Sequence, residues 1–167
     1  KNDHGAGRPL VDELLALADG ETADKVALAH HLRAELNAHH RAEEAVFYNS
    51  LRDLKEGAEI VKKRYQEHAS ADALLHMLSS PDTLPLEWHE GAIALKDALE
   101  DHIADEEGRV FAAARKLIRP EEAEMMARAF LTLKQELAGE EEAQDSDLAA
   151  LVADQMPERF RVPTNHI

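Results

Sequence analysis

The sequence predicts an all-α protein: an up-down-up-down four-helix bundle with an additional C-terminal helix and a tail. Apolar residues make up 44% of the 167 residues, whereas glycine and proline number only 7 and 6. That composition favours helix over strand. Long stretches carry leucines at helical spacing. The segments between these stretches are short, which makes successive helices antiparallel neighbours.

The first three helices end at residues that break helical structure. A helix over residues 9–18 has leucines on one face and ends at Asp19-Gly20. A long second helix extends from Thr22, a potential cap, to about residue 54, and Gly57 marks the turn that follows. A third helix covers about residues 59–78 and ends before Ser79-Ser80-Pro81-Asp82.

The fourth and fifth helices are separated by a proline. The fourth covers about residues 86–118, after Pro85. The fifth begins at Pro120, because proline is tolerated in a first turn and the helix dipole favours the acids that follow it. We expect residues 1–137 to form the bundle with its packing helix. Residues 138–167 are expected to be an acidic linker and a short C-terminal tail, with a short helix over 148–156.

Composition narrows the classes of function. The net charge of −15 argues against nucleic-acid or membrane partners, and the longest basic run is Lys62-Lys63-Arg64. No apolar stretch approaches the roughly 18–20 residues of a membrane span, and no secretory signal is evident, so we expect a cytoplasmic protein. The first residue is Lys1 rather than Met, which is compatible with a natural chain that extends further upstream. The absence of cysteine excludes disulfides, thiolate zinc sites and iron–sulfur clusters.

One helical hairpin occurs twice in the sequence. The series Leu32, Leu36, His39, Glu43, Glu44 recurs with identical spacing as Leu95, Leu99, His102, Glu106, Glu107. Similarly, Asp3-His4 precedes Leu10, Val11 and Leu14 as Glu67-His68 precedes Leu74, Leu75 and Leu78. Each copy therefore bears an acid-His pair followed by a His-x-x-x-Glu motif.

The spacing indicates that these side chains point into the bundle. Residues four apart on an α-helix lie about 40° apart around the axis, so each His-x-x-x-Glu pair continues the leucine stripe of its helix. Buried charges are costly unless they are neutralised, and a metal centre would neutralise them. Imidazole and carboxylate are also the ligands that intracellular transition metals use. The alternative is a set of partly exposed His–Glu helix pairs without metal.

Four blocks of the chain resemble the hemerythrin-like, or HHE cation-binding, domain. They are DHGAGRPLVDELL, HHRAEEAVFYNSL, EHASADALL and DHIADEEGRVF, and the resemblance covers about residues 1–137. It implies two iron ions, oxo- or hydroxo-bridged, inside a four-helix bundle, with Glu43 and Glu106 as bridges. The implied metal ligands are His4, His39, Glu43, His68, His102 and Glu106. His39 is preferred to His40 because His39 aligns with His102, whereas His40 lies about 100° off the stripe.

The sequence departs from the oxygen-carrying hemerythrins at two positions. They have a second histidine four residues after the third-helix ligand, where this chain has Asp72. They also have an aspartate five residues after the fourth-helix histidine, whereas here Glu106, at four, matches better and Glu107 is spare. One imidazole fewer argues against simple reversible oxygen carriage. Asp72 could be a ligand, a residue that orients a histidine, or an exposed acid. Tyr65 could donate a hydrogen bond to a bridging oxygen or a bound ligand, or be an ordinary packing residue.

A histidine-rich iron site favours the ferrous state and the binding of a small ligand. We therefore expect a non-haem di-iron protein that binds or senses dioxygen, peroxide or nitric oxide, with possible weak redox activity toward peroxide or nitric oxide. Zinc or manganese at the same ligands is one alternative. An iron-responsive helical interaction module, with residues 140–147 and 148–167 as its signalling element, is another. We interpret the remaining aromatic and histidine residues as core packing (Phe47, Tyr48, Phe111, Phe130) and as surface or cap positions (His30, His31, His76, His89, His166).

Overall fold

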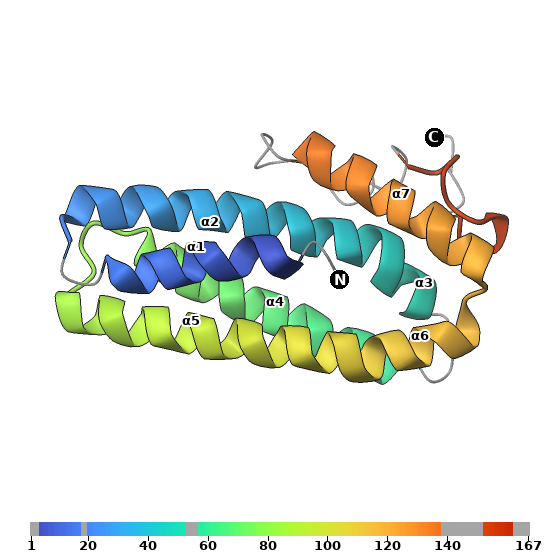
Figure 1. Ribbon diagram of the computed structural model, residues 1–167, viewed down its shortest axis with the longest axis horizontal. Helices are drawn as coiled ribbons and strands as arrows, with labels where there is room; N and C mark the ends of the chain where they lie inside the picture. The colour runs from blue at the N-terminus through green and yellow to red at the C-terminus, as the bar shows by residue number, and fades with distance from the viewer. Residues whose placement is uncertain (1–3, 18–19, 53–56, 138–151, 162–167) are drawn as a thin grey trace, which may run out of the picture. The chain divides into compact units, whose positions relative to one another are not determined.

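The computed structural model describes residues 4–17, 20–52, 57–137 and 152–161, and the side chains from Arg8 onward within them. The described residues are predominantly helical and include no strand, which confirms the all-α class (Figure 1). They belong to two compact units. The first comprises Lys1–Asn37 and Arg64–Arg109, and the second comprises Ala38–Lys63 and Val110–Ile167.

The first unit is built from four helical segments around one apolar core. They are α1 (His4–Ala16), the first part of α2 (Thr22–Glu43), most of α4 (Ala58–Leu78) and α5 (Pro85–Asp105). Helices α1 and α5 lie side by side (Figure 1), and Lys96 Nζ pairs with Asp12 Oδ1 at 2.8 Å between them. The core takes buried residues from all four segments, among them Val11, Leu14, Leu32, Leu36, Leu75, Leu78, Leu95 and Leu99. The leucine stripes predicted from the repeat are therefore the core of this unit.

Trp88 fixes the junction between α4 and α5. Its side chain is buried, and its indole Nε1 donates a hydrogen bond to the carbonyl of Leu78, the last residue of α4, at 3.2 Å. Lys25 Nζ lies 4.9 Å from the centre of the ring, within the range of a cation–π interaction. Helix α5 begins at Pro85, one residue before the predicted start, because proline is tolerated in the first helical turn.

The second unit contains the shorter helices. After the end of α2 come η1 (Glu44–Tyr48), α3 (Asn49–Arg52) and the start of α4, and later in the chain α6 (Phe111–Leu117), α7 (Pro120–Leu137) and η3 (Glu158–Phe160). Helix α7 contacts η1 and is the additional helix predicted from Pro120 onward. Its inner face is apolar and buried at Met126, Ala129, Leu133 and Leu137.

Two helices that we expected to be continuous contain π-helical turns. The predicted helix over 22–54 is interrupted by η1, and the helix over 86–118 is interrupted by η2 (Glu106–Val110). The turn η1 begins directly after Glu43, and η2 begins at Glu106, so each lies at the glutamate end of a His-x-x-x-Glu motif. A π-turn inserts one residue into a helix, and such turns occur frequently at functional sites. Hydrophobic spacing does not reveal them, because the helix continues on both sides.

The described part of the C-terminal segment packs on α7. Residues 152–156 form turns rather than the predicted short helix, and Pro157 precedes the 3-10 turn η3. Arg159 donates hydrogen bonds to Glu122 of α7 at 2.6 and 2.8 Å, which fixes this segment. Residues 138–151 and 162–167, which include most of the predicted linker, lie outside the described residues. Among the described residues, no helix combines the length and the apolar composition that a membrane span requires.

Candidate metal centre

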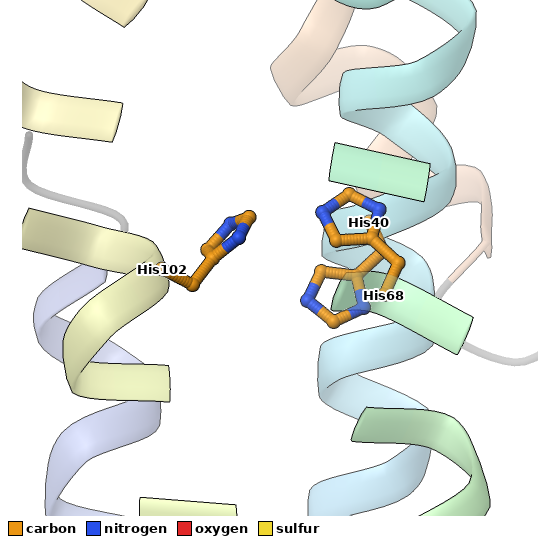
Figure 2. Close-up of side chains that lie close together, drawn as sticks. All are labelled: His40, His68 and His102. Carbon is orange, nitrogen blue, oxygen red and sulfur yellow. The ribbon is translucent and has the colours of Figure 1, made fainter. Parts of the chain in front are cut away.

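Three predicted ligands are buried in the first unit. His68 of α4 and His102 of α5 are each 5% exposed, and Glu106, the first residue of η2, is 0% exposed. The ring centroids of His68 and His102 lie 5.0 Å apart, and Figure 2 shows the His102 side chain extending from α5. His102 Nε2 and Glu106 Oε2 are 4.0 Å apart. The four-residue spacing therefore places imidazole and carboxylate on one side of the helix, as predicted.

Two predicted ligands are buried in the second unit, at the end of α2. His39 and Glu43 are 8% and 6% exposed, and His39 Nε2 lies 2.9 Å from Glu43 Oε1. The His39 ring also packs edge-to-face against Phe130 of α7, with the ring centroids 5.4 Å apart. Phe130, which the sequence indicated as a packing residue, thus restricts the orientation of a predicted ligand.

Tyr48, which the sequence predicted to be a core packing residue, lies beside the predicted ligand Glu43. It is completely buried, and its Oη lies 3.5 Å from Glu43 Oε2, longer than an ordinary O–H···O hydrogen bond. Five residues along a regular α-helix would rotate Tyr48 about 140° away from Glu43. The π-turn η1 instead returns it to the same side. No sequence signal for that turn is evident.

His40 is as buried as its neighbour His39. It is 5% exposed, although the repeat places it away from the leucine stripe. His40 follows Leu36 by four residues and His39 follows it by three, so both lie on the buried side of α2. Burial therefore does not distinguish the two histidines, and the choice of His39 as the ligand stays a prediction.

Two residues beside His102, Glu67 and Arg64, were not among the site residues predicted from the sequence. Glu67 Oε2 lies 2.9 Å from His102 Nδ1. Arg64, whose side chain is 1% exposed, pairs with both Glu67 and Asp105. Glu67 is part of the repeated acid-His pair, but the pattern gave no indication that its partner is His102 rather than the adjacent His68.

The remaining predicted site residues have different surroundings. His4 is the first residue of α1, but its side chain lies outside the described part of the chain. Asp72 accepts a hydrogen bond from Arg33 Nε at 2.9 Å, and its side chain is 42% exposed. Tyr65 on α4 is half-buried. The roles predicted for His4, Asp72 and Tyr65 therefore stay predictions.

The other described histidines are on the surface, as predicted. His30, His31, His76 and His89 are all exposed, and His166 lies outside the described residues. The buried histidines are thus concentrated in the repeated motifs and at His40.

The buried donor set suits a metal cation. Imidazole nitrogens and carboxylate oxygens match iron, zinc or manganese, and a bound cation would lower the cost of burying the carboxylates. Buried His and Glu side chains form groups that could hold a metal ion. The members of these groups are His40, Glu43, His68, His102 and Glu106. Four of the six predicted ligands are among them, together with His40.

Comparison with known proteins supports a cation-binding role. The chain is 29% identical over 103 residues to a DNA nickase of Nostoc sp. (strain PCC 7120 / SAG 25.82 / UTEX 2576), an alignment that covers 62% of this chain and 29% of that protein. The chain thus spans less than a third of that relative's length. No solved structure matches it. The family model of the hemerythrin HHE cation-binding domain matches residues 1–114 of the chain. The chain therefore belongs to the hemerythrin HHE cation-binding domain family.

Proposed function

We propose that this protein holds a non-haem di-iron centre that binds or senses a small ligand, namely dioxygen, peroxide or nitric oxide. Family membership supports metal binding, and iron is the metal that the hemerythrin-like resemblance implies. The proposed ligands are His4, His39, Glu43, His68, His102 and Glu106. Glu43 and Glu106 are the proposed bridging carboxylates, since each is buried one turn beyond a ligand histidine.

The observation that carries the proposal is the burial of a His-x-x-x-Glu pair in each unit. His39 with Glu43, and His102 with Glu106, place carboxylates at 6% and 0% exposure. Neither unit alone contains the full ligand set that the family resemblance implies. The hemerythrin-like resemblance implies a single di-iron centre, and on that ground we propose that both ligand sets belong to it.

The chemistry follows from the ligands. Bound iron would supply reversible one-electron chemistry and a coordination position open to a small ligand. Neutral imidazoles leave more positive charge on the metal than carboxylates do, which favours the ferrous state. The position where oxygen carriers have a further histidine is Asp72, whose carboxylate pairs with Arg33. We propose that this leaves one metal position available to the small ligand.

Metal analysis combined with absorption spectroscopy tests this function. The chain expressed with iron is expected to retain two iron ions and to develop a ligand-to-metal charge-transfer band on exposure to oxygen. Titration of the anaerobic ferrous protein with dioxygen, peroxide and nitric oxide, each separately, then identifies the ligand. Stoichiometric zinc without a visible band after growth in iron would refute the iron proposal. Zinc and manganese are the alternative metals, and intrinsic affinity favours zinc over ferrous iron.

A second candidate function is an iron-responsive interaction module. The docking of Arg159 on Glu122 favours it, because it attaches a C-terminal segment to α7, the helix whose Phe130 packs on His39. A change at His39 could therefore alter the docking of the segment. Limited proteolysis of the C-terminal segment with and without iron tests the idea. Identical digestion patterns would argue against such a switch.

The short alignment and the acidic charge of this chain argue against the DNA-directed activity named for the Nostoc relative. The alignment covers only 29% of that protein, and a net charge of −15 repels a phosphate backbone. Fluorescence anisotropy with a labelled duplex at low salt is expected to show no binding. Saturable binding would instead indicate that the protein has a nucleic-acid partner.

A further inference from the structure

We propose that Glu67 and Arg64 are positioning residues for His102. In this proposal Glu67 holds the His102 ring as the tautomer with hydrogen on Nδ1, which leaves the lone pair on Nε2 for a metal, and Arg64 fixes the orientation of Glu67. Metal binding by the oriented ring rests on the proposed function, whereas the orientation of His102 by Glu67 does not.

The distances around Nδ1 identify the tautomer. His102 Nδ1 lies 2.9 Å from Glu67 Oε2 and 3.5 Å from Arg64 Nη1. A guanidinium can only donate and a carboxylate only accept, so the two neighbours demand opposite states of Nδ1. The shorter distance lies within the normal hydrogen-bond range and the longer one lies beyond it. Nδ1 therefore donates to Glu67, and a neutral ring then has its lone pair on Nε2.

Arg64 restrains the Glu67 carboxylate at both oxygens. Its Nη1 lies 2.9 Å from Glu67 Oε2, and its Nη2 lies 3.3 Å from Glu67 Oε1. Arg64 Nη1 also donates to the carbonyl oxygen of His102 at 3.3 Å, and Nη2 pairs with Asp105. The guanidinium thus connects α4 to two points on α5, the carbonyl oxygen of His102 and the carboxylate of Asp105. A planar, always charged guanidinium is suited to this geometry, which a lysine cannot reproduce.

The network around His102 belongs to the second hairpin, and the first hairpin differs from it at the position equivalent to Asp105. In the repeat, the counterpart of Asp105 is Ala42, which is buried and has no carboxylate. His39, the counterpart of His102, has its Nε2 2.9 Å from Glu43 and its ring against Phe130. The ion pair between Arg64 and Asp105 therefore has no equivalent at the position of Ala42.

The direct test is the tautomer of His102 in the metal-free, full-length protein. Long-range ¹H–¹⁵N spectra of histidine-labelled protein at neutral pH distinguish the two tautomers, and the His102 signals are identified by their loss in His102→Gln. We expect the Nδ1–H form in the wild type and in Glu67→Gln, whose side-chain carbonyl still accepts. We expect loss of that preference in Glu67→Ala. An Nε2–H ring in the wild type, or an unchanged tautomer in Glu67→Ala, would overturn the proposal.

Metal affinity gives a second readout, with Co²⁺ as the probe. Loss of a carboxylate behind a ligand histidine typically lowers metal affinity about 10- to 100-fold. We expect that loss for Glu67→Ala, substantial rescue for Glu67→Gln, and no change for the control Glu100→Ala, an exposed acid on the same helix as His102. Equal affinity of Glu67→Ala and the control would overturn the positioning role. Failure of the wild type to bind metal, with the tautomer still following Glu67, would refute the proposed function and leave the orientation of His102 standing.

Discussion

His39 and His102 occupy equivalent positions in the repeat, yet their surroundings differ. His102 has Glu67 2.9 Å from Nδ1 and Glu106 4.0 Å from Nε2, whereas His39 has Glu43 2.9 Å from Nε2 and an edge-to-face contact with Phe130. Spacing could predict that both imidazoles are buried beside a glutamate. It could not predict these partners, because Glu67 and Phe130 come from other helices.

The choice between adjacent histidines in α2 gives a sharp residue-scale prediction. His39→Ala is expected to abolish the oxidised-iron absorption, because it removes a ligand aligned with His102. His40→Ala is expected to retain that absorption, as is the surface control His89→Ala. Metal content and absorption spectra of the three variants provide the measurement. If His40→Ala is the damaging change, the assigned register of α2 is wrong.

Arg64 illustrates how composition can mislead. It ends the longest basic run of the sequence, but Lys62 and Lys63 are exposed whereas Arg64 is 1% exposed. The run is therefore not a basic patch. The sequence alone could not show which of the three side chains is buried, because the carboxylates that pair with Arg64 come from other helical turns.

Removal of Arg64 should destabilise the metal-free protein. Arg64→Ala removes the buried counter-charge that Asp105 and Glu67, 13% and 28% exposed, share, while Asp105 keeps its pair with the exposed Arg109. The cost is expected to be about 3 kcal/mol, the low end for breaking a buried pair because Glu67 is partly solvated. Arg33→Ala, which breaks the exposed pair with Asp72, should cost less than about 1 kcal/mol. Urea unfolding measures both, and equal costs would contradict the burial argument.

At the scale of elements, the helices could be predicted and their interruptions could not. Leucine spacing and the breaks at Gly57 and Pro120 place α4 and α7 within about a residue of their observed starts. The π-turns η1 and η2 have no such signal. They nevertheless determine which side chains reach the ligands, since η1 brings Tyr48 toward Glu43.

Two glycines give opposite predictions for element geometry. A Cβ added at Gly57, before α4, would collide with the backbone of Leu51, whereas one added at Gly108, in η2, would meet nothing within 4 Å. Gly57→Ala is therefore expected to destabilise the protein by about 1–3 kcal/mol, because backbone must move. Gly108→Ala is expected to be neutral or to stabilise it by up to about 1 kcal/mol, as alanine favours helix. Thermal unfolding of both variants checks the contrast, which equal shifts would contradict.

The docking of the C-terminal segment on α7 predicts a pH dependence. Hydrogen bonds from Arg159, and then from Arg119, hold the pKa of Glu122 well below its ordinary value of 4.5. A lowered pKa means that this contribution is complete above pH 4.5 and declines as the pH falls below it. The difference in urea midpoint between wild type and Glu122→Gln should therefore be largest near pH 7 and shrink toward pH 3. A difference that is constant with pH would contradict the ion-pair account.

At the scale of the whole molecule, the internal repeat was the most informative feature of the sequence. Matched leucines predicted the core, and matched His-x-x-x-Glu motifs predicted four of the residues now found buried: His39, Glu43, His102 and Glu106. The identity of the metal could not be predicted from the donors, because imidazole and carboxylate also suit zinc and manganese. That ambiguity concerns chemistry rather than geometry.

The most direct test of the central claim, that both hairpin copies serve one metal pair, is Mössbauer spectroscopy of the full chain loaded with ⁵⁷Fe. The account predicts two ferric ions per chain, magnetically coupled to a diamagnetic ground state, with the coupling lost in both His39→Ala and His102→Ala. A single uncoupled high-spin ferric ion in the wild-type protein, or coupling that survives either substitution, would contradict it.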